Sequence, residues 1–91
     1  MRYVGAATVS VAGRVLRVPV RLSGRFEPVE GRFRWAGRSG AVALAEAFRA
    51  GARDVTVRID GGPERPARLA DPDPWGGIRL TGTGTPPWPP A

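Results

Sequence analysis

The sequence contains no cysteine, no histidine and no lysine, and these absences exclude several kinds of protein. Without cysteine the chain cannot be held together by disulfides, and without cysteine and histidine it lacks the side chains of the usual zinc sites. A hydrolase with a catalytic triad needs a histidine, and an enzyme that forms a Schiff base needs a lysine. We therefore expect no cofactor and no catalytic machinery of the protein's own.

The chain also has no long apolar run. After Arg2 it alternates like a strand and does not form the apolar stretch of a signal peptide. We therefore expect a cytoplasmic protein that does not enter a membrane. At 91 residues it is one domain, of a size at which burial and ordering entropy nearly cancel. A homodimer or a larger partner is therefore expected.

All fourteen positive charges are arginine, and the net charge is +6. This bias is typical of a GC-rich genome, such as an actinobacterial one, and it favours contact with nucleic acid, an anionic metabolite or an acidic protein. If neighbouring strands align their outward arginines, they form a basic face as in oligonucleotide-binding barrels; otherwise they are an ordinary solvated face. The arginines expected to point outward are Arg17, Arg21, Arg32, Arg34, Arg58, Arg68 and Arg79.

The largest apolar content of the chain lies in residues 24–37, which predict a hairpin. Phe26 enters it, residues 27–31 reverse the direction, and Phe33 and Trp35 leave on one inward face. Gly24 permits a sharp bend before this hairpin. Two aromatic side chains from one strand would fill much of a small interior, so we expect the other elements to cover this face.

Alternating apolar residues predict further strands at residues 3–11, 14–22, 54–59, 65–70 and 78–82. Pro19 cannot donate a hydrogen bond, which makes its strand an edge or locally irregular. Ser39 is expected to cap a short helix that ends at Gly51 and buries an apolar stripe. That stripe consists of Ala41, Leu44, Ala45 and Phe48.

This order predicts a mainly β (β-rich α+β) fold, a small, highly curved antiparallel sheet or barrel of about seven strands with one short helix. An open α+β sandwich is the alternative. We expect one domain at residues 1–82 and a tail rich in proline and glycine at residues 83–91, which is mobile unless Trp88 docks on the domain.

Four stretches together resemble the actinobacterial family grouped as domain of unknown function 4873. The resemblance spans nearly the whole chain and implies a module that occurs alone or fused behind flavin-dependent monooxygenases, with no settled activity. The family pattern has Tyr-His before the hairpin tryptophan, where this chain has Phe33 and Arg34. The matching stretches are residues 3–7, 24–35, 71–76 and 81–84.

Two pairs of carboxylates are candidate sites. Glu27 and Glu30 flank one turn and could do acid and base work, although turn glutamates are usually solvated. Asp71 and Asp73 alternate with proline beside Trp75 and could form the rim of a ligand or hard-cation site. The alternative for them is a turn whose carboxylates accept hydrogen bonds from nearby backbone, and two carboxylates alone make a poor calcium site.

The aromatic residues are the remaining candidates. Tyr3, Phe33, Trp35 and Trp75 could line a pocket for an apolar small molecule, or they could fill the core. Core filling is favoured for Phe33 and Trp35. Trp75 is the one favoured to contact a ligand or a second subunit.

Three functions remain open from the sequence. The first is an accessory or ligand-binding module that works beside a flavin-dependent oxidoreductase or within a biosynthetic pathway. Its contact surface would be Trp35, Trp75 and the rim of Asp71 and Asp73. The second is a small barrel cyclase or isomerase that folds an apolar substrate in a cavity. The third is nucleic-acid binding through the arginines.

Overall fold

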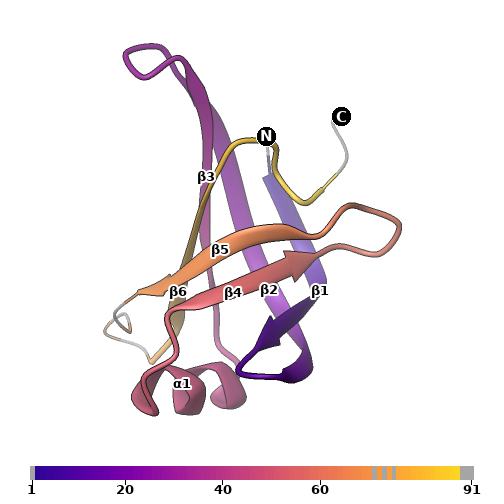
Figure 1. Ribbon diagram of the computed structural model, residues 1–91, viewed down its shortest axis with the longest axis vertical. Helices are drawn as coiled ribbons and strands as arrows, with labels where there is room; N and C mark the ends of the chain where they lie inside the picture. The colour runs from indigo at the N-terminus through magenta and orange to yellow at the C-terminus, as the bar shows by residue number, and fades with distance from the viewer. Residues whose placement is uncertain (1, 71, 73, 75, 89–91) are drawn as a thin grey trace.

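The computed structural model describes residues 2–70, 72, 74 and 76–88. They form six strands and one helix in a closed antiparallel barrel with the strand order β1-β2-β3-β6-β5-β4 (Figure 1). The predicted fold, a small antiparallel barrel with one short helix, is confirmed. In chain order the elements are β1 (Arg2–Val11), β2 (Arg14–Glu27), β3 (Arg32–Ser39), α1 (Val42–Arg49), β4 (Asp54–Arg58), β5 (Arg65–Ala70) and β6 (Ile78–Thr83).

The sequence predicted about seven strands, and the barrel has six. The difference arises because β2 runs without a break through Gly24, where the sequence predicted a bend. Glycine is needed there for a different reason. A Cβ on Gly24 would lie 2.5 Å from Cε1 of Phe33, so the aromatic ring occupies the space that a side chain would fill. The second predicted strand and the entry strand of the hairpin are therefore one element of 14 residues.

At Pro19, β2 pairs with β1 but not with β3. Pro19 faces Ala6 of β1, whereas the register between β2 and β3 begins only at Arg21 and Arg38. The missing N–H of proline therefore costs the sheet no hydrogen bond to β3. The sequence predicted this local edge, although the barrel as a whole is closed.

The helix closes one end of the barrel (Figure 1). Of the predicted stripe, Leu44 and Ala45 are buried, and Ala41 and Phe48 are partly buried against the core. The predicted cap is wrong by two residues. The N-cap is Ala41, which has no side-chain capping bond, and Ser39 instead accepts a hydrogen bond at its Oγ from the backbone N–H of Ala41 at 3.2 Å. Gly51 follows the helix with φ 106°, a conformation that favours glycine.

The inward residues of all six strands form one apolar core. Its centre is Trp35, which lies between Gly24 of β2 and Gly82 of β6 in the cross-strand register. A Cβ on Gly82 would lie 2.1 Å from Cε2 of Trp35, so the indole lies directly over this glycine. Trp88 completes the core, because its ring meets that of Trp35 edge to face with centroids 6.2 Å apart.

The chain after β6 crosses the end of the barrel opposite α1, where it is drawn in yellow in Figure 1. Pro86, Pro87 and Trp88 are buried. A Cβ on Gly62 would lie 2.6 Å from the carbonyl oxygen of Pro87, so this segment packs closely on the turn between β4 and β5. Trp88 thus docks on the domain, the condition under which the sequence predicted that the tail is held in place.

Candidate binding surfaces

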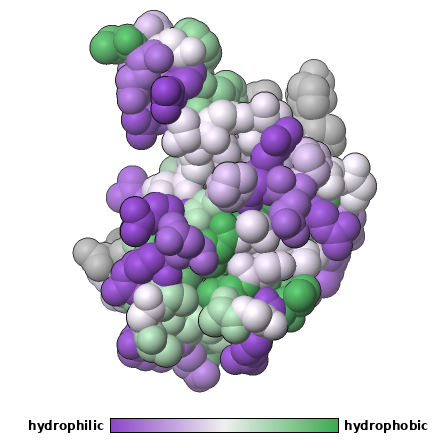
Figure 2. Space-filling view, viewed as in Figure 1, coloured by the Kyte–Doolittle hydropathy of each residue, from purple (hydrophilic) through white to green (hydrophobic). Residues whose placement is uncertain are grey.

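The β2–β3 hairpin extends beyond the barrel as a two-stranded arm, here defined as residues 26–33 (Figure 1). Pairing of β2 with β1 ends at Ser23, and pairing of β3 with β6 ends at Arg34. Phe26 and Val29 are 58% and 92% exposed on this arm. Figure 2 shows the corresponding hydrophobic surface at the far end of the molecule, separated from the body by a notch. The arm therefore presents apolar side chains to solvent away from the core.

The two candidate glutamates, Glu27 and Glu30, lie on the arm, and each has an arginine beside it. Arg34 donates two hydrogen bonds to the carboxylate of Glu30, one of them from Nε to Oε1 at 2.6 Å. Glu27 lies 3.5 Å from a guanidinium nitrogen of Arg25. The hydrogen bond from Arg34 lowers the pKa of Glu30, and this exposed carboxylate is therefore ionised at neutral pH. A general acid needs the opposite shift, so the arrangement is that of ion pairs on a solvated ribbon.

Two of the aromatic candidates pack in the apolar core. Trp35 is part of the core, and Tyr3 is partly buried against it. The hydroxyl of Tyr3 donates to the carbonyl oxygen of Ala6 at 2.7 Å, and its ring covers Gly5. Trp35 is 2% exposed, which confirms core filling for this residue. Its indole N–H is buried and has no hydrogen-bond partner within the part of the chain that the structure describes.

The predicted rim falls on Asp71, Asp73 and Trp75, and these three lie outside the described residues. Of the same segment, Pro72 and Pro74 are described, and both are exposed. They line a hollow of about 890 Å³ on the outer surface together with Arg2, Val4, Arg21, Leu22, Ser23, Ala36, Gly37, Arg38 and Arg79. The contact proposed for Trp75 stays a prediction.

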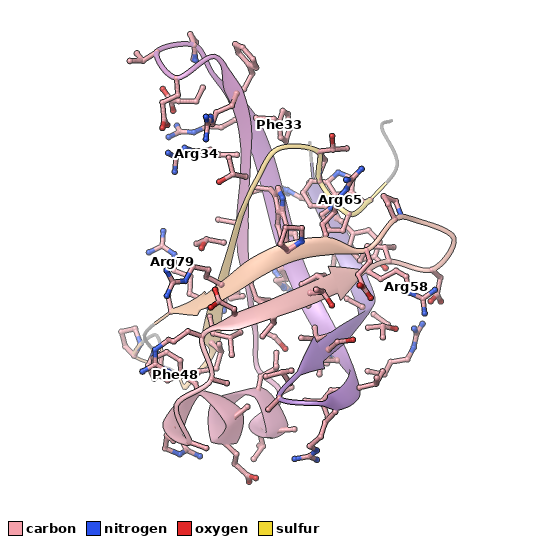
Figure 3. All side chains as sticks on the ribbon, in the orientation of Figure 1. Phe33, Arg34, Phe48, Arg58, Arg65 and Arg79 are labelled. Carbon is pink, nitrogen blue, oxygen red and sulfur yellow. The ribbon has the colours of Figure 1, made fainter. Side chains whose placement is uncertain are left out.

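The register of the barrel aligns several outward arginines. Arg38 of β3 lies directly opposite Arg21 of β2 on one side and Arg79 of β6 on the other. Four positions along the strands, Arg25 lies opposite Arg34. Figure 3 shows Arg34 and Arg79 on the same side of the molecule, and Arg58 on the other. The basic face that the sequence made conditional on strand alignment is therefore present over β2, β3 and β6.

Other predicted arginines do not join this face. Arg17 is held by Asp60, with NH1 and NH2 donating to the two carboxylate oxygens at 2.9 and 2.7 Å. This bidentate pair raises the pKa of Arg17 and lowers that of Asp60, mainly through the hydrogen bonds. Arg32 lies on the arm opposite Glu27. Arg17 and Arg32 therefore lie away from the basic face, each beside an acidic residue.

Sequence reasoning missed one arginine of the basic face, Arg25. A signal for Arg25 was present, because the alternation that places Arg21 outward continues through Ser23 to Arg25 if β2 does not break at Gly24. The hydroxyl residues Ser23, Thr81 and Thr83 were also missed. They line a second hollow of about 550 Å³ together with Arg25, Arg34, Arg68 and Arg79.

Among the described residues, no histidine, cysteine, aspartate or glutamate side chains gather in groups of three or more that could hold a metal ion. Of the described segments, none is a helix with the length and apolar character needed to cross a bilayer.

The comparisons with known proteins give a family and no function. The uncharacterized proteins Rv0943c of Mycobacterium tuberculosis and Mb0968c of Mycobacterium bovis are each 41% identical to this chain over 86 residues. The match covers 94% of this chain and 24% of each relative, so the chain spans about a quarter of their length. No solved structure matches. A family model described as a domain of unknown function (DUF4873) matches residues 1–89, and the chain belongs to this family.

Proposed function

We propose that this chain is an accessory binding module that works with a larger oxidoreductase, or in a biosynthetic pathway, and has no catalytic machinery of its own. The observation that carries the proposal is the arm, which exposes Phe26 and Val29 beyond the barrel. An exposed aromatic residue on a projecting ribbon is the kind of feature that anchors protein contacts. In this proposal the end of the arm contacts the larger enzyme.

Two further observations support a binding role. In the described structure, Arg34 pairs with Glu30, and Arg25 lies beside Glu27, so neither carboxylate of the arm is arranged as a proton donor. The longer mycobacterial relatives have about three-quarters of their length outside the matched segment, which fits a module joined to other parts. The resemblance of this family to modules fused behind flavin-dependent monooxygenases suggests a flavin enzyme as the partner.

The same proposal places the module in the cytoplasm, where such oxidoreductases act, and retains the homodimer expected from its small size. The cyclase alternative needs an internal chamber, whereas here Trp35, Trp88 and the aliphatic residues pack together as one apolar core. This filling is the reason to prefer a binding module.

The test is binding of the purified protein to a flavin-dependent oxidoreductase of the same organism, followed by co-elution and by turnover of that enzyme. We expect a complex that is lost when Phe26→Ser and Val29→Ser are combined, because both changes remove exposed apolar contact area. Val15→Ser is the matched control, since Val15 is 70% exposed on the barrel, away from the arm. Absence of any complex, or equal loss with the control, would contradict the proposal.

A further inference from the structure

The wall of the barrel opens where β5 and β6 part. Their register pairs residues 68–70 with residues 79–81 and ends there. Beyond it, β5 continues beside β4 as far as Arg65, and β6 continues beside β3 as far as Thr83. Figure 1 shows β6 running beside β3 toward the arm while β5 crosses the body of the molecule. The two strands therefore diverge, and residues 65–67 and 82–83 form the two sides of a wedge.

The hollow of about 550 Å³ lies at this wedge, because residues from both of its sides line it. Pro66 and Ala67 contribute from β5, and Gly82 and Thr83 from β6. Trp35 of the adjoining strand β3 lines the same hollow. Pro66 and Thr83 are exposed, whereas Ala67 and Trp35 belong to the apolar core. The lining of the hollow thus extends from the surface to the core.

The edge of the Trp35 indole that carries the N–H lies over Gly82. A Cβ on Gly82 would be 2.5 Å from Nε1 of Trp35 and 2.1 Å from Cε2. A larger residue at this position would meet that edge, whereas glycine leaves it uncovered on the side of β6. Because the register between β5 and β6 has ended at Thr81, the wedge begins directly beside Gly82. The indole N–H therefore lies at the inner end of the hollow.

This N–H is a polar group that the fold buries without a partner. Trp35 is 2% exposed, and its Nε1 has no hydrogen-bond acceptor within the described structure. Buried donors are nearly always paired, because an unpaired donor loses its hydrogen bonds to water and gains none in return. The ring of Trp35 fills the core, and its N–H adds nothing to that packing. An acceptor brought into the hollow from outside would supply the missing hydrogen bond.

We propose that this hollow binds a small neutral molecule through a carbonyl oxygen, which accepts a hydrogen bond from Nε1 of Trp35. An indole N–H can only donate, and a carbonyl oxygen can only accept, so the two groups are matched. The apolar body of the ligand contacts Val55, Pro66 and Ala67, which line the hollow on the side of β4 and β5. The ligand enters between two strands whose pairing has ended, so no hydrogen bond between β5 and β6 has to break.

The ion pairs of the hollow favour a neutral ligand over an anion. Arg34 donates two hydrogen bonds to the carboxylate of Glu30. Arg68 lies 3.5 Å from Asp54, and this carboxylate also lines the hollow. An anion would have to compete with these carboxylates for the guanidinium groups. A carbonyl group held by the uncharged indole has no such competitor.

This inference goes beyond the proposed function, because the ligand occupies the hollow and the larger enzyme is assigned to the end of the arm. Arg34 and Arg79 line the hollow, and Figure 3 shows them on the same side of the molecule, at the base of the arm and on the body. Figure 2 shows the notch between arm and body. A ligand at the base of the arm leaves Phe26 and Val29 free.

The experiment is titration of the protein, isotope-labelled at its indole nitrogens, with acetophenone, followed by NMR of the indole N–H signals. Acetophenone joins one carbonyl group to an apolar ring. We expect a saturable downfield shift of the Trp35 signal, with a dissociation constant at or below about 5 mM. Ethylbenzene has the same ring without the oxygen, and it should bind at least about fivefold more weakly. Trp35→Phe assigns the signal, because this variant lacks it.

Thr83→Phe tests the place of the ligand without altering the core. It puts a ring into the outer part of the hollow and should weaken acetophenone binding by about tenfold or more. Thr8→Phe is the matched control, because Thr8 belongs to β1, whereas the hollow is lined by residues of β2 to β6. It should leave binding within about twofold.

Four results would overturn the assignment. Equal binding of ethylbenzene and acetophenone would mean that the hydrogen bond contributes nothing. An unchanged Trp35 signal at about 20 mM acetophenone, or equal weakening by Thr83→Phe and Thr8→Phe, would mean that the ligand does not enter this hollow. Tighter binding of benzoate than of acetophenone would mean that the arginines, and not the indole, select the ligand.

The combined Phe26→Ser and Val29→Ser variant separates the two proposals. It should bind acetophenone as the unaltered protein does, even though it no longer binds the oxidoreductase. Loss of acetophenone binding in this variant, with the fold intact by circular dichroism, would contradict the assignment of the ligand to the hollow. Loss of the enzyme complex in Thr83→Phe would instead contradict the assignment of that contact to the end of the arm.

Discussion

On the inner face of β2, β3 and β6, Trp35 lies between Gly24 and Gly82, whereas on the outer face of the same strands Arg38 lies between Arg21 and Arg79. The inner row is complementary, because the ring of Trp35 covers Gly82 and the ring of Phe33 covers Gly24. The outer row repeats one long, charged side chain three times. Complementary neighbours stabilise the fold, whereas like charges that face one another across strands destabilise it.

The comparison explains how one small sheet can serve two purposes. Along β3 the side chains alternate, so Trp35 stabilises the interior while Arg34 and Arg38 face solvent. Substitutions on the inner face should therefore change stability, and substitutions on the outer face should mainly change binding. The size of the effect on stability tests whether the two faces are separable.

The largest effect is expected for Trp35→Ala. Removing a fully buried indole, together with its edge-to-face contact with Trp88, should lower the free energy of unfolding by about 3–5 kcal/mol. Urea denaturation followed by circular dichroism measures this change. Phe26→Ala is the control, since Phe26 is exposed on the arm and its removal should cost no more than about 0.5 kcal/mol. Similar losses for both variants would mean that the arm contributes as much to stability as the barrel interior does.

A smaller loss is expected for Gly82→Ala, which tests the complementarity of the inner row. The new methyl group would lie 2.1 Å from the ring of Trp35, and the indole cannot move freely because Trp88 packs against it. Overpacking of this kind should cost about 1–3 kcal/mol. Gly40→Ala provides the control, because a Cβ there meets nothing within 4 Å, and its effect should stay within about 0.5 kcal/mol. A neutral Gly82→Ala would show that the indole is free to shift.

Much of the inner face could be predicted from the sequence, because it depends on a local pattern. Alternating valine, leucine and isoleucine identify the strands, and the spacing of Phe33 and Trp35 places both on one face. The structural role of Gly24 could not be predicted in the same way. A glycine favours a bend as well as a close approach, and only the ring of Phe33 beside it decides between the two.

The outer face depends on the register, which the sequence does not specify. Arg38 lies between Arg21 and Arg79 because it pairs with residues that are 17 and 41 positions away along the chain. A shift of register would separate these arginines from one another without changing the alternation of any strand. The docking of Trp88 has the same origin, since nothing local to the segment rich in proline predicts a partner in Trp35. The sequence thus predicts which residues point outward and leaves open which of them meet.

The smallest effect on stability, and the one that separates the two faces most sharply, is expected for Arg79→Gln in the absence of ligand. Removing one of three aligned positive charges should raise the free energy of unfolding at low salt by an amount within about 1 kcal/mol. The gain should shrink as salt is added, because screening already weakens the repulsion between exposed charges. Arg17→Gln should have the opposite sign, since it breaks the bidentate pair with Asp60. If Arg79→Gln instead lowers stability as Arg17→Gln does, the charge of Arg79 is already neutralised within the fold.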